Sequence, residues 1–227
     1  MSGRRARAVF LDAGGTIVLP ERGLVAKALM GEGIEIDPAA VPSAHYAAVR
    51  ALDREHVPGG PDSYIEALCV ALGASTASAV AALSTLADRN QSGKVLWSEP
   101  TPSAVETITA LRRAGIAVVI VTNSDGHAAE NLRDAGILRA TGLAAESVVD
   151  SVLVGSAKPD ERIFEVALER AGVRPGDAVH VGDMVSTDVA GAERVGITPI
   201  HLDPYRRCPS GQHLHVRSLP GILAQIA

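Results

Sequence analysis

The segment VFLDAGGTI, residues 9–17, combines a short apolar run with an abrupt stop at Asp12. The apolar run is typical of a buried strand. Gly14 and Gly15 follow the aspartate, and glycine permits a tight turn that bulkier residues would strain. The segment therefore predicts a buried strand that ends in a loop carrying a carboxylate.

Downstream of residue 100, short apolar strands alternate with segments of helical periodicity. We expect helices over residues 103–114, 128–135, 161–171 and 188–195, and strands over residues 116–122, 147–149, 178–181 and 198–202. Strands that alternate with helices form βαβ crossovers and a parallel sheet. The predicted fold class is therefore α/β, with a Rossmann-like parallel sheet as its core.

Residues 19–97 differ from the rest of the chain, because they are rich in alanine and their apolar residues recur at helical spacing. Glycine, proline and aspartate separate the helical segments. The block lies between the first strand and the remaining strands, so we interpret it as an insertion. The expected organisation is a core of residues 1–18 and 98–227 with a small α-helical domain of residues 19–97.

The amino-acid composition limits the classes of protein to which the chain can belong. The chain of 227 residues is 47% hydrophobic and 21% charged, which favours a globular fold, and we expect no membrane-spanning segment. A net charge of −5 argues against nucleic acid as a partner, since such binding needs clustered Lys and Arg. Two cysteines, Cys69 and Cys208, form no zinc or disulfide spacing, so a reducing cytoplasm is the expected location.

Polar residues follow four of the apolar runs, and in parallel α/β sheets ligands bind at the carboxyl ends of strands. The four places are Asp12, the Thr122–Asn123 pair, Lys158, and Asp183 with Asp188. Each alone has an ordinary explanation: a Gly-Gly turn, a helix N-cap, a loop, or an acid at a helix start. Together, a carboxylate, a hydroxyl, a lysine and further carboxylates are typical of a site that handles phosphate with a hard divalent cation.

The ordered motifs resemble those of the haloacid dehalogenase-like hydrolase superfamily. The matching segments are VFLDAGGTI (9–17), VIVTNSD (119–125), AKPDERIFEVALERAGV (157–173) and VHVGDMVSTDVAGAERVG (179–196), in the order that the superfamily shows. The resemblance implies a Rossmannoid core, with residues 19–97 as an α-helical cap inserted after the first motif. It also implies hydrolysis of a small phosphorylated metabolite. It implies no single substrate, and the sequence does not indicate an oligomeric state.

The resemblance also implies a role for each motif residue. Asp12 corresponds to the nucleophile that forms an aspartyl-enzyme intermediate, and Thr122 to the hydroxyl that hydrogen-bonds the transferring group. Lys158 corresponds to the cation that neutralises charge at the site. Gly15, Thr122, Asn123 and Lys158 are expected to contact the substrate. The implied cofactor is Mg²⁺, held by Asp12, the Gly14 carbonyl and Asp183, with Asp188 as a further ligand, direct or through water.

One position departs from the phosphatase pattern. Phosphatases of the superfamily carry a second Asp two residues after the nucleophile, where it protonates the leaving group and then activates water, and here that position is Gly14. The loss of a positioned acid–base group typically costs about 10² to 10⁴ in rate. The backbone carbonyl that would contact the metal survives the change. Proton transfer is therefore expected to suffer while metal binding persists.

Three interpretations remain open at this point. The chain could be a phosphatase that is slow or that uses another base, of which the candidates are His127, His45, Asp53 and His56. It could be a 2-haloacid dehalogenase, since that branch also lacks the second Asp, although dehalogenases dispense with the metal carboxylates. It could instead bind a phosphorylated ligand or partner without efficient turnover. Phosphonate hydrolysis ranks lower, because it uses a cap lysine and residues 19–97 offer only Lys27 and Lys94.

Several histidines and cysteines have simpler interpretations. His213 and His215 form an HxH pair that no third ligand accompanies in the sequence, which is typical of a surface strand or loop. His180 lies inside an apolar strand and is interpreted as a core histidine whose hydrogen bonds are satisfied. Cys69 is expected to pack within a helix.

Overall fold

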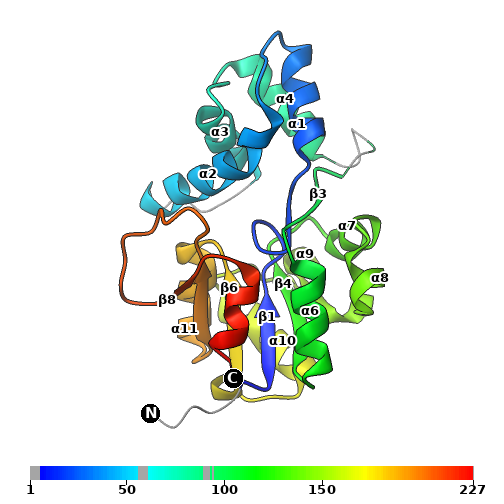
Figure 1. The fold of residues 1–227 in the computed structure, drawn as a ribbon, viewed down its shortest axis with the longest axis vertical. Coiled ribbons are helices and arrows are strands. Elements are labelled where there is room, and N and C mark those ends of the chain that lie inside the picture. The colour runs from blue at the N-terminus through cyan, green and yellow to red at the C-terminus, as the bar shows by residue number, and fades with distance from the viewer. Residues whose placement is uncertain (1–5, 56–60, 89–92, 94, 227) are drawn as a thin grey trace. The chain divides into compact units, whose positions relative to one another are not determined.

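The computed structural model describes residues 6–55, 61–88, 93 and 95–226. The chain divides into two compact units, one formed by Met1–Val18 with Pro100–Ala227 and the other by Leu19–Glu99. Figure 1 shows the sheet of the first unit and the helices of the second. Of the candidate bases, His56 lies outside the described residues, as does the cap lysine Lys94.

The first unit is built on a six-stranded parallel sheet, as expected from the alternating pattern. Its strand order is β5-β4-β1-β6-β7-β8. The strands span β1 Ala8–Leu11, β4 Ala117–Thr122, β5 Val148–Asp150, β6 Ala178–Gly182, β7 Thr198–Leu202 and β8 Leu214–Val216. Because β1 pairs with β4 on one side and β6 on the other, the first strand in sequence lies near the sheet centre. This is the doubly wound arrangement, in which segments far apart in sequence meet at one edge.

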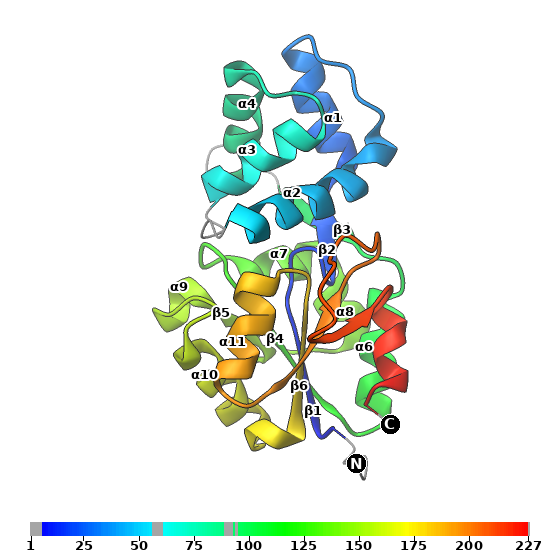
Figure 2. The same ribbon diagram turned by 90° about the vertical axis from the view of Figure 1, so that its left-hand side faces the viewer.

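Helices cover both faces of the sheet, with α10 and α11 on one side and α6 on the other (Figure 2). They span α6 Ala104–Arg113, α10 Glu161–Ala171 and α11 Ala190–Arg194, with the shorter α7 Ala128–Asp134, α8 Ile137–Thr141 and α9 Ser151–Val154 beside β5 and the end of β4. Phe10 of β1 and Phe164 of α10 are both fully buried in one apolar cluster. A strand buried on both faces explains why β1 and β4 are continuously apolar.

The expected elements of this unit agree with the structure, with one exception. The helix expected over residues 188–195 begins earlier, as the π-helical turn η4 Val185–Val189, and continues as α11. The helices α8 and α9 and the strand β8 were not among the expected elements. Short 3₁₀ turns complete the unit: η2 Ala145–Ser147, η3 Pro175–Asp177 and η5 Leu219–Ala224.

The Leu19–Glu99 unit consists mainly of helices α1 Arg22–Gly31, α2 Val41–Glu55, α3 Pro61–Ala71 and α4 Ala77–Ala87, with the turn η1 Pro38–Ala40. Leu29, Leu68 and Leu83 are fully buried in its own apolar core. Cys69 is buried in the same core, in agreement with the expected helix packing. Strands β2 Val18–Pro20 and β3 Trp97–Pro100 pair where the chain enters and leaves this unit.

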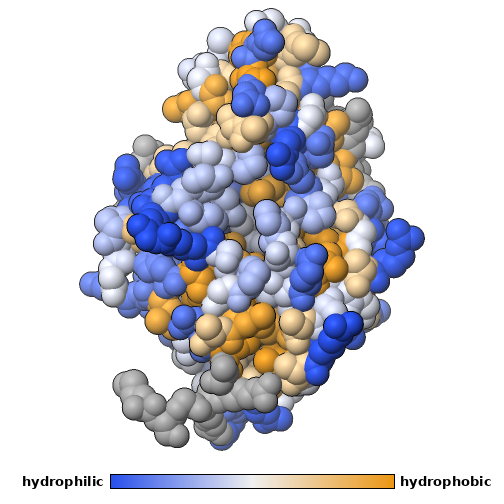
Figure 3. All heavy atoms as spheres, viewed as in Figure 1, coloured by the Kyte–Doolittle hydropathy of each residue, from blue (hydrophilic) through white to orange (hydrophobic). Residues whose placement is uncertain are grey.

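The surface is mixed in character, and Figure 3 shows hydrophobic side chains scattered among hydrophilic ones on the face in view. The large hydrophobic residues with the greatest exposure are Leu153, Val70 and Met30. None of the helices in the described part of the chain is long and apolar enough to cross a membrane.

Candidate functional site

Asp12 follows β1 directly, and its backbone N–H donates to the carbonyl of Val181 at 2.8 Å. The register pairs Leu11 with Val181, so Asp12 and Asp183 leave neighbouring parallel strands at the same edge. In the loop that follows, the Ala13 carbonyl accepts the N–H of both Ile17 and Val18. This tight loop requires Gly15 to adopt a φ of 72°, which glycine tolerates without strain.

Lys158 joins two of the candidate carboxylates. Its Nζ lies 2.6 Å from Asp12 Oδ1 and 2.6 Å from Asp188 Oδ1, and its side chain is almost completely buried. Burial by itself would lower the pKa of Lys158, but the charges of Asp12 and Asp188 outweigh it and raise the pKa above the usual lysine range. Lys158 is therefore a permanent buried ammonium in contact with the predicted nucleophile.

Asn123 holds Lys158 in this position. Its Oδ1 accepts the backbone N–H of Lys158 at 2.7 Å, and its Nδ2 donates to the Lys158 carbonyl at 2.9 Å. The amide thus links the end of β4 to the loop before α10. Asn123 was expected to contact substrate, and that contact stays a prediction; its hydrogen bonds in the structure give it a positioning role.

Asp188 is held by three donors. Its Oδ1 accepts from Lys158 Nζ and from His180 Nε2, the latter at 2.9 Å, and its Oδ2 accepts the backbone N–H of Met184 at 3.1 Å. Burial would raise the pKa of Asp188, but Lys158 and His180 outweigh it and hold the pKa well below the usual range. Asp188 is therefore a fixed anion that anchors the lysine.

His180 was interpreted from sequence as a core residue, and it is buried, but it also contacts the site through Asp188. Its ring packs edge-on against Phe164, and burial lowers the pKa of the imidazole. A neutral ring donates its Nε2 proton to Asp188. Its Nδ1 is buried without a hydrogen-bond partner among the described residues, so the interpretation that its hydrogen bonds are all satisfied was wrong.

Gly182 makes room for the Asp188 carboxylate. A Cβ at residue 182 would collide with the Asp188 side chain, which lies directly over the glycine. Gly182 is the last residue of β6 and precedes Asp183. The glycine is therefore required by close packing at the site, because its own backbone φ is ordinary.

Three carboxylates gather at this edge of the sheet. One oxygen from each of Asp12, Asp183 and Asp188 lies within 4.8 Å of the others, and all three residues are buried. Burial raises the pKa of Asp12 to about 7; Lys158 opposes the shift, and the charges of Asp188 and Asp183 add to it. Mutual repulsion among three buried carboxylates this close together favours a bound cation. Oxygen ligands of this kind suit a hard divalent ion such as Mg²⁺.

The structure also locates Thr122 and three of the candidate bases. Thr122 ends β4 and is buried beside Asn123. His127 precedes α7, and its ring nitrogen lies 3.4 Å from a carboxylate oxygen of Asp125. In the helical unit, Asp53 is buried, and His45 is buried with its Nδ1 2.9 Å from the hydroxyl of Tyr64.

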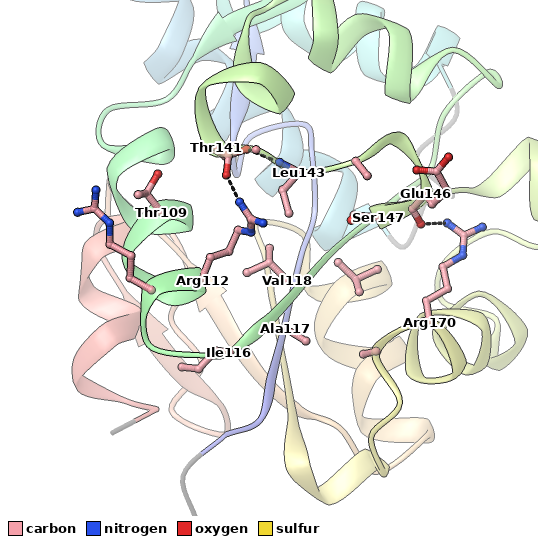
Figure 4. Close-up of a pocket in the computed structure, with 15 residues that line it drawn as sticks. Thr109, Arg112, Ile116, Ala117, Val118, Thr141, Leu143, Glu146, Ser147 and Arg170 are labelled. Atoms are coloured by element: carbon pink, nitrogen blue, oxygen red, sulfur yellow. Dashed lines mark hydrogen bonds between the residues drawn. The ribbon is translucent and has the colours of Figure 1, made fainter.

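A separate depression lies at the opposite, amino end of β4 (Figure 4). It has a volume of about 780 Å³ and is lined by Arg112, Arg170 and the first residues of β4. Arg112 donates to the Thr141 carbonyl, and Arg170 donates to the carbonyls of Glu146 and Val148 at 2.8 and 2.7 Å. These arginines link the segment between α8 and β5 to helices α6 and α10. None of the candidate site residues lines this depression.

The chain matches the haloacid dehalogenase-like hydrolase family over residues 6–196. Glyceraldehyde 3-phosphate phosphatase of Methanopyrus kandleri is 34% identical over 112 residues, which are 48% of this chain and 46% of that protein. Phosphoserine phosphatase of Thermus thermophilus is 36% identical over 103 residues, 45% of this chain and 40% of that protein. The matched stretch thus spans less than half the length of these curated relatives.

Solved structures share the fold along nearly the whole chain. The HAD-hydrolase YfnB of Bacillus subtilis, bound to magnesium, superposes with a TM-score of 0.70 at 18% identity, covering 98% of this chain and 99% of that one. A dehalogenase with an intermediate complex gives a TM-score of 0.64 at 21% identity, covering 98% of both chains. At such identities the likeness supports the fold alone.

Proposed function

Because the chain belongs to the haloacid dehalogenase-like hydrolase family, we propose that it is a Mg²⁺-dependent phosphatase that hydrolyses a small phosphomonoester through Asp12. The observation that carries the proposal is the contact between Lys158 and Asp12, at 2.6 Å, beside a cluster of three buried carboxylates. Phosphatase names among the relatives support this chemical class.

Asp12 and Asp183 would hold Mg²⁺ with the Gly14 carbonyl. One oxygen from each of the two aspartates lies within 4.8 Å of the other in a buried acidic cluster, which fits a divalent cation. Asp188 already accepts three hydrogen bonds, so its place is as an anchor or as a ligand through water. When bound, Mg²⁺ would neutralise charge on the phosphoryl oxygens and so lower the barrier to attack by an anion.

In the proposed reaction an Asp12 carboxylate oxygen attacks phosphorus, and the bond from phosphorus to the leaving alcohol oxygen breaks. The alcohol takes a proton from water or from a nearby acid. Water then attacks the aspartyl phosphate, the bond between phosphorus and Asp12 breaks, and inorganic phosphate leaves with the carboxylate restored. Lys158 offsets charge on Asp12 and on the transferring oxygens throughout. Thr122 would hydrogen-bond the transferring group.

Gly14 makes proton transfer the weak step of this reaction. No side chain at residue 14 can protonate the alcohol or activate water, and a positioned acid–base group is worth about 10² to 10⁴ in rate. Both steps lose this help, but only the second depends on water as the nucleophile, so for an ester whose alcohol leaves readily the second step should be the slower one. We expect the aspartyl phosphate to accumulate during turnover.

The activity test is phosphate release from a panel of small phosphomonoesters, measured with Mg²⁺ and with EDTA. We expect release that requires Mg²⁺ and that falls at least about 100-fold in Asp12→Asn, which keeps the shape of the side chain but removes the nucleophilic carboxylate. Asp125→Asn is the matched control, since Asp125 is an exposed carboxylate near the same strand ends. Equal rates in the wild type and Asp12→Asn would overturn the proposal.

Two further measurements test the role of Gly14. Acid quenching during turnover should trap a covalent phosphoprotein in the wild type and none in Asp12→Asn. Gly14→Asp should raise steady-state phosphatase rate by about 10-fold or more and reduce the trapped fraction. An unchanged rate with no trapped species would mean that another group supplies the proton.

The two alternatives, a dehalogenase and a binding protein, predict different results in further assays. Halide release from 2-haloacids that is insensitive to EDTA would identify a dehalogenase. A blank phosphatase panel, together with a higher melting temperature in the presence of Mg²⁺ and inorganic phosphate, would identify a binding protein. The buried carboxylate cluster favours the phosphatase over the dehalogenase, because a dehalogenase would have no use for its charge.

A further inference from the structure

A second group of potential ligands lies on β8, the outermost strand of the sheet, on its neighbour β7 and on the loop between them. It consists of His201, Cys208, His213 and His215, with one ligand atom from each residue within 4.8 Å of the others. The sequence offered no third ligand beside the HxH pair and no zinc spacing for Cys208. The structure places His201 and Cys208 beside the HxH pair, so the interpretation that no third ligand accompanies the pair was wrong.

Strand register explains how the three histidines meet. His201 of β7 is paired with His215 of β8, and paired residues on neighbouring strands project from the same face. His213 lies two residues before His215, so the strand alternation places it on that face too. The ring centroids are 5.2 Å apart for His201 and His213, 5.0 Å for His201 and His215, and 4.5 Å for His213 and His215.

The carboxylate of Asp203 brings Cys208 back to this group. Asp203 Oδ1 accepts the N–H of Arg207 at 2.9 Å, and Oδ2 accepts the N–H of Cys208 at 2.8 Å. The backbone N–H of Asp203 is in turn bonded to the carbonyl of Val216 in β8. The loop is thus folded over the end of β7, and it leaves Cys208 Sγ 3.8 Å from His213 Nε2.

The ligand spacing matches the edges of a tetrahedral zinc site. With Zn–N bonds of about 2.0–2.1 Å and a Zn–S bond of about 2.3 Å, two nitrogens lie about 3.4 Å apart and a nitrogen and a sulfur about 3.6 Å apart. His201 Nδ1 and His213 Nε2 are 3.2 Å apart, and the sulfur is 3.8 Å from His213 Nε2. Little movement would bring these atoms onto one ion.

The hydrogen bonding of two of the rings leaves a nitrogen available to a metal. His201 Nε2 lies 3.1 Å from the carbonyl of Asp183 and must donate to it, which leaves Nδ1 with its lone pair toward the group. A ligating histidine typically donates its other N–H in this way. His215 Nε2 is buried and has no hydrogen-bond partner among the described residues.

We propose that His201, Cys208, His213 and His215 bind one Zn²⁺ ion. The three nitrogens and one sulfur are ligands that zinc prefers, whereas the carboxylate cluster offers oxygen only. The two sites therefore select different metals. Four protein ligands fill a tetrahedron, which makes this a structural zinc site that fastens β8 and the 203–213 loop to β7.

The zinc site is connected to the carboxylate site through a single residue. His201 bonds the carbonyl of Asp183, whose side chain belongs to the carboxylate cluster. Zinc bound to Nδ1 makes the Nε2–H a stronger donor and fixes the orientation of the ring. The ion thereby supports the backbone of Asp183, although the binding of zinc itself does not depend on the proposed phosphatase activity.

The test uses the full chain, treated with a chelator and a thiol reductant and then transferred to buffer with excess Mg²⁺ to occupy oxygen sites. Titration with Co²⁺, which takes the same geometry as Zn²⁺, is followed by absorbance. We expect visible bands of tetrahedral Co²⁺ and a near-ultraviolet thiolate band, both saturating at one equivalent and both abolished by one equivalent of Zn²⁺. The melting temperature should rise with the same stoichiometry.

Variants assign the ligands. Cys208→Ser should lose the thiolate band, and His215→Ala should weaken Zn²⁺ binding by at least about 100-fold. Cys69→Ser is the matched control, because Cys69 is the other cysteine and lies in the helical unit; it should keep both bands. Circular dichroism of each variant without metal establishes that it is folded. Zinc content of the purified wild type, measured by mass spectrometry, is an independent readout.

Two results would overturn the proposal. One is a wild type that shows no tetrahedral Co²⁺ bands and takes up no more Zn²⁺ than Cys208→Ser. The other is a thiolate band that survives in Cys208→Ser and disappears in Cys69→Ser. In either case the four residues are a hydrogen-bonded cluster without a metal. Because every readout is independent of phosphate release, failure here leaves the proposed phosphatase activity standing, and the reverse also holds.

Discussion

Asp12 is stable as a carboxylate only where its charge is balanced, and within the described site Lys158 balances it in part. Asp183 and Asp188 bring two more negative charges within 4.8 Å. Burial of such a group costs free energy, which bound Mg²⁺ or a change of protonation can relieve. The buried carboxylates therefore lower the stability of the metal-free protein, and binding of the proposed Mg²⁺ would restore it. Such a trade between stability and function is common at active sites.

This cost predicts that Asp12→Asn stabilises the metal-free protein at pH 8. The pKa of Asp12 is raised from 3.8 to about 7 by folding, chiefly by burial. Between these values the folded state holds the extra proton more tightly, so stability falls as pH rises from about 4 to about 7, and the cost is complete above that. Thermal unfolding in EDTA should give a higher melting temperature for Asp12→Asn at pH 8 and a smaller gain at pH 5. A variant that melts below the wild type at pH 8 would contradict this account.

Removal of Lys158 should have the opposite effect. Lys158→Met leaves Asp12 and Asp188 buried without their ammonium partner, and breaking a buried ion pair from one side costs about 3–5 kcal/mol. Urea unfolding at pH 7.5 in EDTA should show a loss of this order. Lys27→Met, at an exposed position of α1, is the matched control and should change stability by less than about 0.5 kcal/mol. Equal effects of the two changes would mean that the buried lysine is not paired as described.

At the scale of elements, the turn η4 is shaped by Asp188. The helix predicted over residues 188–195 starts instead at Val185, as a π-helical turn, and the Asp188 carboxylate bonds back to the N–H of Met184. π-Helical turns are often found at functional sites. This turn places Asp188 over Gly182 and beside Lys158. The irregular start of the helix is therefore what allows Asp188 to anchor the lysine.

Gly182→Ala should therefore disrupt this element. The added Cβ would collide with the Asp188 side chain, and the turn would have to move. Overpacking of this kind costs about 1–3 kcal/mol, and the proposed phosphatase rate should fall with it because Asp188 anchors Lys158. Gly176→Ala is the control, since a Cβ there meets no atom within 4 Å and the backbone φ is not positive. Chemical denaturation and rate measurements on both variants would decide whether the collision matters.

The strands could be predicted from sequence because they are buried on both faces. Continuous apolar runs ending in a polar residue located β1, β4, β6 and β7, and Asp12 and Asp183, which follow β1 and β6, lie close together at the carboxyl edge. The ordered motifs brought Asp12, Lys158 and the two later aspartates into one hypothesis, and their contacts agree with it. Long periodic segments and strand ends can be recognised from the order of the residues alone.

Sequence analysis missed the interactions that depend on distant residues or on irregular turns, because local patterns do not indicate them. The hydrogen bonds of Asn123 to the backbone of Lys158 join residues 35 positions apart, and nothing in either motif alone indicates them. The contact of His180 with Asp188 depends on the irregular turn. The His/Cys group depends on a three-residue strand and on a loop folded by Asp203, whose ligand spacing fits no common zinc pattern. Its only signal in the sequence was the HxH alternation.

At the scale of the whole molecule, each of the two units has an apolar core among its described residues. One lies among the helices of Leu19–Glu99 and contains Leu83, and the other lies against the sheet and contains Phe164. The residues of both proposed metal sites belong to the sheet-containing unit. Since each unit buries its own apolar side chains, each has the main requirement of a cooperative folding unit.

Damage to one core should therefore stay within its own unit. Leu83→Ala removes a fully buried side chain from the helical core, at a cost of about 2–5 kcal/mol. Hydrogen exchange followed by mass spectrometry under native conditions should show faster exchange for the amides of Leu19–Glu99, while the amides of β1, β4 and β6 keep their protection. Ile120→Ala, at a fully buried position of β4, should accelerate exchange in the sheet. If Leu83→Ala accelerated exchange in the sheet as much as in the helices, the two cores would unfold together, because only coupling between them could carry the lost free energy from one to the other.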